Sequence, residues 1–116
     1  MSTYSDKVNN HAVHISLENV QNELKSIREK NLIPEAIEVI ARITLVIKNF
    51  SISIENCNKE LIAITWLEDA SKALENIKSY LVSYNSNKDV NTLRNNSNSQ
   101  IDILLHTSVK LNCVKS

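Results

Sequence analysis

Residues 34–61 read PEAIEVIARITLVIKNFSISIENCNKEL and contain one unbroken apolar stripe. Its members are Ala36, Ile40, Ile43, Ile47, Phe50, Ile54, Cys57 and Leu61. The intervals alternate between four and three residues, which is the spacing of a helix face that packs in coiled-coil fashion. Phe50–Ile54 also alternates apolar and polar residues as a strand would, but the helical spacing continues through it. We therefore predict a helix over 34–60, opened by the only proline of the chain.

Three further stripes have the same spacing. The first comprises Val13, Leu17, Val20, Leu24 and Ile27 and predicts a helix over 4–30. The second comprises Leu67, Ala70, Leu74, Ile77 and Leu81 and predicts a helix over 66–84. The third comprises Val90, Leu93, Ser97, Ile101, Leu104, Ser108 and Leu111 and predicts a helix over 87–112. Four helices with short connections predict an all-α, up-down antiparallel four-helix bundle with coiled-coil-like heptad packing. The main structural alternative is a three-helix unit completed by a second chain.

Capping signals give the expected helix ends. Thr3 with Asp6, and Thr65 with Glu68, have the spacing of capping boxes, so we expect Thr65 to be the N-cap of the third helix. Residues 84–88, YNSNK, have the composition of a loop. Residues 95–99, NNSNS, form the weakest helical stretch and are expected to fray or kink, because their side chains compete for backbone groups.

The chain of 116 residues contains no glycine. It therefore lacks the glycine-rich phosphate loops, the tight hairpins and the nucleophile elbow that many catalytic folds use. Thirteen basic residues balance thirteen acidic ones, so no overall field attracts nucleic acid or an anionic membrane. The composition predicts a single domain over 1–116, while the lack of a stop signal after Leu111 leaves open an N-terminal module of a longer protein.

The expected location is the cytoplasm. The polar N-terminus lacks the apolar core of a signal peptide, and charged residues interrupt the most apolar segment, 33–47, so no membrane span is predicted. The abundance of Asn, Ile and Lys is compatible with an AT-rich bacterial genome.

Metal and catalytic chemistry receive little support. His11, His14, Cys57, His106 and Cys113 are zinc-ligating types that up-down topology brings to one end of the bundle. The helical wheel points the histidines away from one another, so we predict no metal site and no cofactor. No Glu-x-x-His motif is present, and no nucleophile lies beside a base, so the chain is not predicted to be an enzyme. Cys57 and Cys113 are expected to be free thiols, because the simplest topology places the second and fourth helices on a diagonal.

A small basic cluster, Lys25, Arg28 and Lys30, ends the first helix, where positive charge is favourable in any helix. We therefore predict no nucleic-acid site there. The polar residues Thr44, Ser97 and Ser108 near the stripes are the only hints of a ligand cavity.

Apolar residues outside the stripes exceed what a lone bundle requires. The second helix has Ile37, Ala41, Leu45 and Ile52, and the third has Trp66, Ala73, Tyr80 and Tyr84. Leu45 and Ile52 lie roughly 160–180° from the centre of their stripe, where a surface helix is normally polar. These eight residues are the predicted interface, although a nearly fully buried second helix would explain them equally well.

The sequence therefore predicts a non-catalytic oligomerisation or protein-docking module that forms a homodimer through the second helix or the aromatic edge of the third. The alternative is a stand-alone binder that neutralises or regulates a partner protein. In length, helix count and neutral polar surface the chain is similar to the small four-helix bacteriocin immunity proteins, a likeness of class that implies such a role. A bundle that binds a small molecule is a third hypothesis.

Overall fold

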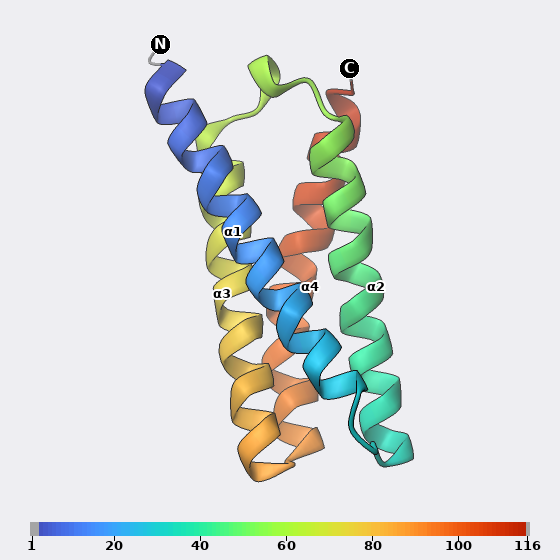
Figure 1. Ribbon diagram of the computed structural model, residues 1–116. Helices are drawn as coiled ribbons and strands as arrows, with labels where there is room; N and C mark the ends of the chain where they lie inside the picture. The colour runs from blue at the N-terminus through green and yellow to red at the C-terminus, as the bar shows by residue number, and fades with distance from the viewer. Residues whose placement is uncertain (1–2, 116) are drawn as a thin grey trace.

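The computed structural model describes residues 3–115, with side chains from Asn10 onward. Four helices are present: α1 (Thr3–Arg28), α2 (Pro34–Asn56), α3 (Ile64–Asn87) and α4 (Val90–Cys113), with a 3₁₀ turn at Lys59–Leu61. They form a rod of 47 × 23 × 22 Å in which successive helices run in opposite directions (Figure 1). The predicted all-α four-helix bundle is confirmed. Residues 50–54 are helical, so the strand alternative is excluded.

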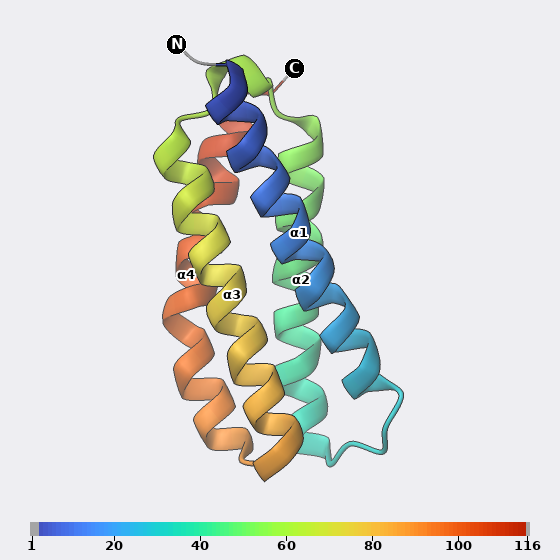
Figure 2. The ribbon, with the colours of Figure 1, turned by 60° about the vertical axis from the view of Figure 1, so that its left-hand side comes forward.

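The neighbours within the bundle differ from the simplest expectation. α1 packs along α3 and α2 packs along α4, so each of these pairs is parallel, while α3 and α4 form an antiparallel pair (Figures 1 and 2). The segment 57–63 crosses the end of the bundle, so α2 and α3 lie on a diagonal. The expectation that α2 and α4 occupy opposite corners is therefore wrong. α1 and α2 touch along only a short stretch.

The core consists of the inward stripes of all four helices. Its largest fully buried members are Phe50, Leu24, Ile27, Ile40, Ile43, Ile47, Ile54, Leu74, Ile77, Leu81, Leu93 and Ile101. Every member of the α1 and α3 stripes is buried, and so is every member of the α2 stripe up to Cys57. The heptad spacing therefore identified the core, because residues three and four apart share one side of a helix.

Several predicted helix ends are wrong by a few residues. α1 ends at Arg28 and α2 at Asn56, so Leu61 is exposed in the 3₁₀ turn instead of extending the α2 stripe. α3 begins at Ile64 with Ala63 as N-cap and no side-chain cap bond, so Thr65 is not the cap. The side chains of Thr3 and Asp6 lie outside the described residues. α4 continues through 95–99, where Asn98 accepts a hydrogen bond from Arg42 of α2 at 2.8 Å.

The junction between α3 and α4 is shorter than the predicted loop at 84–88. α3 continues to Asn87, and Lys88 alone makes the turn, with φ 57° and ψ 25° in the left-handed region. Its backbone N–H donates to Tyr84 O at 2.7 Å. Asp89 then caps α4, and its carboxylate accepts bonds from the backbone and the hydroxyl of Thr92 at 3.1 and 2.7 Å. α4 therefore begins at Val90 and not at the predicted residue 87.

We expect Lys88→Gly to stabilise the bundle. A residue with a Cβ loses roughly 1–2 kcal/mol in the left-handed conformation, and glycine avoids this cost. After the larger backbone entropy that glycine loses on folding, the expected gain in the free energy of unfolding is about 0.5–1 kcal/mol. Urea denaturation measures it. Lys88→Ala is the control, because it removes the same side chain and keeps the Cβ; equal effects of the two variants would contradict the explanation.

Asp89 should make the stability pH-dependent. Hydrogen bonds from the Thr92 side chain and then its backbone lower the pKa of Asp89 below the ordinary 3.8. A lowered folded-state pKa stabilises the fold above the unfolded pKa, and this contribution is lost as the pH falls through the folded value. Asp89→Ala should lower the melting temperature by a few degrees at neutral pH and have progressively less effect in acid. Asp89→Asn retains a capping acceptor and should show no such pH dependence. An Asp89→Ala deficit that is constant with pH would be inconsistent with this assignment.

Candidate functional site

The outward side of α2 is apolar. Ile37, Leu45 and Ile52 are 52%, 58% and 48% exposed, and Ala41 is exposed between them. These four residues, together with Pro34 at the start of the helix, form what we call the α2 outer face. It is open because α2 packs closely only against α4, while α1 leans toward α3. A half-exposed branched side chain leaves much of its apolar area in water, and three such side chains on one side of a surface helix are unusual.

Two opposite charges accompany the α2 outer face. Glu38 and Lys48 are both exposed, and on the helical wheel they lie roughly 50° and roughly 30° from the middle of the face, on opposite sides of it. Glu38 stands at the edge toward α4, beside Arg42, and Lys48 stands at the edge toward α1. The face is therefore a mixed strip, with apolar residues along its centre and one charge of each sign near its two ends.

The predicted second stripe of α3 is not a free surface. Ala73 and Tyr84 are buried, with 0% and 4% exposure. Trp66 and Tyr80 are half-buried and pack against the core. The ammonium group of Lys110 also lies 6.0 Å from the centre of the Trp66 ring. Ala73 and Tyr84 therefore belong to the interior and Trp66 and Tyr80 to its edge, because α3 has neighbours on two sides, α1 and α4.

Exposed apolar residues also occur on α4. Leu105 and Val109 are 44% and 61% exposed. Leu105 follows Asn98 by seven residues and so lies on the same side of α4, where Asn98 meets Arg42 of α2. The sequence pattern gives no signal for these two residues, because only the α2–α4 pairing brings their edge of α4 beside α2.

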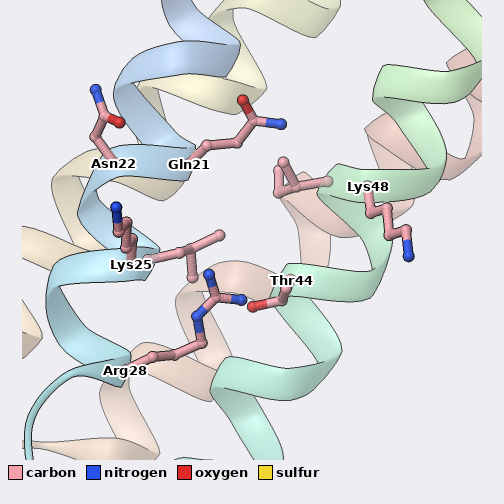
Figure 3. A pocket seen from close by; sticks show the side chains of 8 residues that line it. Gln21, Asn22, Lys25, Arg28, Thr44 and Lys48 are labelled. Atoms are coloured by element: carbon pink, nitrogen blue, oxygen red, sulfur yellow. The ribbon is translucent and has the colours of Figure 1, made fainter.

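A pocket of about 320 Å³ lies between α1 and α2. Its lining residues are Gln21, Asn22, Leu24, Lys25, Arg28, Thr44, Ile47 and Lys48. In Figure 3 the Arg28 guanidinium extends from α1 across the opening to the Thr44 hydroxyl on α2, while the Gln21 amide extends toward α2 higher up in the view. Lys25 and Lys48 stand at the two outer rims. The pocket exists because α1 and α2 separate along most of their length.

The pocket collects polar residues that the sequence had shown only separately. Thr44 was a hint of a cavity, and Lys25 and Arg28 belonged to the basic cluster at the end of the first helix. The third member of that cluster, Lys30, instead donates to Asn85 of α3 at 2.6 Å. Gln21 and Lys48 gave no signal, since both occupy ordinary polar positions of their helices.

The other two polar residues that suggested a cavity, Ser97 and Ser108, do not lead to a large one. Ser97 is buried, and its hydroxyl has no partner among the described side chains. It borders a void of about 40 Å³, close to the room that a single water molecule requires. Ser108 is half-buried.

The histidines and cysteines that could ligate zinc do not form a cluster in the described part of the chain. His11, His14, His106 and Cys113 are exposed, and among the described residues no three or more His, Cys, Asp or Glu side chains are grouped for a metal ion. Cys57 is buried, and its thiol donates to Ile54 O at 3.1 Å. Its backbone forms an isolated bridge with Lys115, so the ends of α2 and α4 lie close together. Both cysteines are nevertheless free thiols.

Comparison with protein-family models, with curated proteins and with solved structures finds no significant match to this chain. Over residues 3–115, none of the helices combines the length and the apolar character that crossing a bilayer requires.

Proposed function

We propose that this protein is a non-catalytic oligomerisation module whose α2 outer face pairs with the same face of a second copy. The observation that supports this most strongly is the exposure of Ile37, Leu45 and Ile52 in the folded single chain. Fully burying such a side chain contributes roughly 1.5–3 kcal/mol, so covering the exposed halves on both copies provides a substantial driving force.

The spacing within the α2 outer face suits an antiparallel pair. Ala41, Leu45, Lys48 and Ile52 are separated by four, three and four residues, with Glu38 three residues before Ala41. This is a second heptad seam on the side of α2 that faces away from its own core. A heptad seam on a straight helix fits a neighbouring helix, and a two-fold axis makes one surface serve both copies.

Size and charge favour one register. With the two-fold axis between Ala41 and Leu45, the small Ala41 lies opposite the partner's Leu45, and the reverse contact repeats across the axis. The same register brings Glu38 to the partner's Lys48, so two opposite-charge pairs flank the apolar centre. In a parallel pair, Glu38 would instead lie beside the partner's Glu38, and Lys48 beside the partner's Lys48. Charge complementarity of this kind fixes register more than it adds affinity.

The free thiols agree with a reducing compartment, and so with the cytoplasm as the proposed location. The proposed pairing of two α2 outer faces requires only surface contacts, so we propose no catalytic role. The same holds for nucleic acid, which the neutral overall charge does not favour.

Replacing Leu45 and Ile52 with glutamate should abolish the dimer, because each change buries a carboxylate against the apolar face of the partner. Sedimentation equilibrium of the wild type should give a dimer at high protein concentration, and the double variant should remain monomeric. Leu61→Glu is the matched control, since Leu61 is as exposed as Leu45, at 58%, and lies outside α2. A wild type that is monomeric at every concentration would contradict the proposal and favour the stand-alone binder.

A charge exchange tests the register. Glu38→Lys should weaken the dimer about tenfold, because two lysines then face each other twice per dimer. Adding Lys48→Glu to that variant should restore the wild-type dissociation constant. Glu75→Lys, an equal charge change on exposed α3, should have no effect. If Glu38→Lys dimerises normally while Leu45→Glu does not, the face is correct and the antiparallel register is wrong.

A further inference from the structure

We infer that the pocket between α1 and α2 binds a small oxyanion, a phosphate group or a phosphate ester. The inference goes beyond the proposed function and does not depend on it. Three cations from two helices, Lys25, Arg28 and Lys48, line the pocket, and no acidic residue does. In a chain with equal numbers of acidic and basic residues, this is a local concentration of positive charge.

Arg28 is the central group of the site. Its guanidinium extends into the opening, as Figure 3 shows, and carries five N–H donors in a planar fork that matches two oxygens of one phosphate. The Gln21 amide extends toward α2 from two turns above, at the other end of the opening, and offers two further donors to a ligand that spans it. Lys25 and Lys48 stand at the rims with their ammonium groups turned outward in Figure 3, so they add positive charge near a bound anion without fixed contacts to it.

Two other cations near α1 and α2 are engaged in contacts between segments of the bundle. Arg42 donates to Asn98 of α4 at 2.8 Å, and Lys30 donates to Asn85 of α3 at 2.6 Å. Both of these contacts join neighbouring helices and so have a structural role. Arg28, by contrast, extends from the last turn of α1 into the opening between α1 and α2, as Figure 3 shows.

Thr44 refines the class of ligand. Its hydroxyl donates to Ile40 O of its own helix at 2.7 Å. The proton is therefore committed, and the oxygen is left as an acceptor facing the pocket. An acceptor opposite an arginine suits a ligand that has both an anionic oxygen and a hydroxyl, which a hydrogen phosphate or a hydroxylated phosphate ester provides. The buried Leu24 and Ile47 close the pocket from beneath, so the volume of about 320 Å³ fits a small molecule.

The test uses inorganic pyrophosphate as the probe, followed by amide chemical shifts of the full chain at constant ionic strength. The expected shifts are concentrated in residues 21–28 and 44–48. Lys25→Gln with Arg28→Gln should weaken binding at least about tenfold, since charged hydrogen bonds are lost. Lys72→Gln with Lys115→Gln removes the same charge at exposed positions outside the pocket and should leave the affinity unchanged.

Equal losses of affinity in the two double variants would overturn the inference, because binding would then reflect only net charge. Shifts spread over all basic surfaces would do the same. The titration is repeated in Leu45→Glu, whose side chain does not line the pocket. Retained binding there separates the oxyanion site from dimerisation, so either proposal can fail while the other stands.

Discussion

The diagonal crossing of the segment between α2 and α3 determines most of what is unusual in this bundle. Because α3 is delivered to the corner opposite α2, α1 finds its main partner in α3, and α2 finds its main partner in α4. The fourth side of the bundle, between α1 and α2, is left with few contacts. A helix in a closed bundle normally buries its flanks against two neighbours, whereas α2 has one close neighbour over its length.

Both candidate surfaces arise from that one open side. The α2 outer face is exposed because α1 does not extend over it, and the pocket beside Thr44 exists because α1 and α2 make few contacts with each other. Lys48 stands at the boundary between them. The two surfaces are chemically different: one is an apolar seam suited to another helix, and the other is a cationic opening suited to an oxyanion. Their separation on α2 follows from the helical wheel, since Leu45 and Thr44 are successive residues and point about 100° apart.

The absence of glycine has a visible structural consequence at the α3–α4 junction. Two antiparallel helices joined this closely require a left-handed residue, and the chain uses Lys88 there. Its side chain compensates in part, because the ammonium group donates to Asn85 O at 2.7 Å and lies 5.6 Å from the centre of the Tyr84 ring. Asp89 then provides the N-cap bonds of α4. Side-chain hydrogen bonds thus complete a turn that glycine would make without them.

The sequence alone determined the helices, their inward stripes and the apolar excess on α2, because three-four spacing is a local property of the chain. The capping signal at Thr65 and the loop signal at 84–88 gave wrong helix ends. At both places packing overrides the local signal: α3 begins before Thr65 and continues to Asn87. Only the tertiary structure decided which helices are neighbours, since the stripes of α2 and α3 are equally able to face α1. That choice buried Ala73 and Tyr84, left Leu45 and Ile52 outside, and placed Lys48 and Arg28 around one pocket.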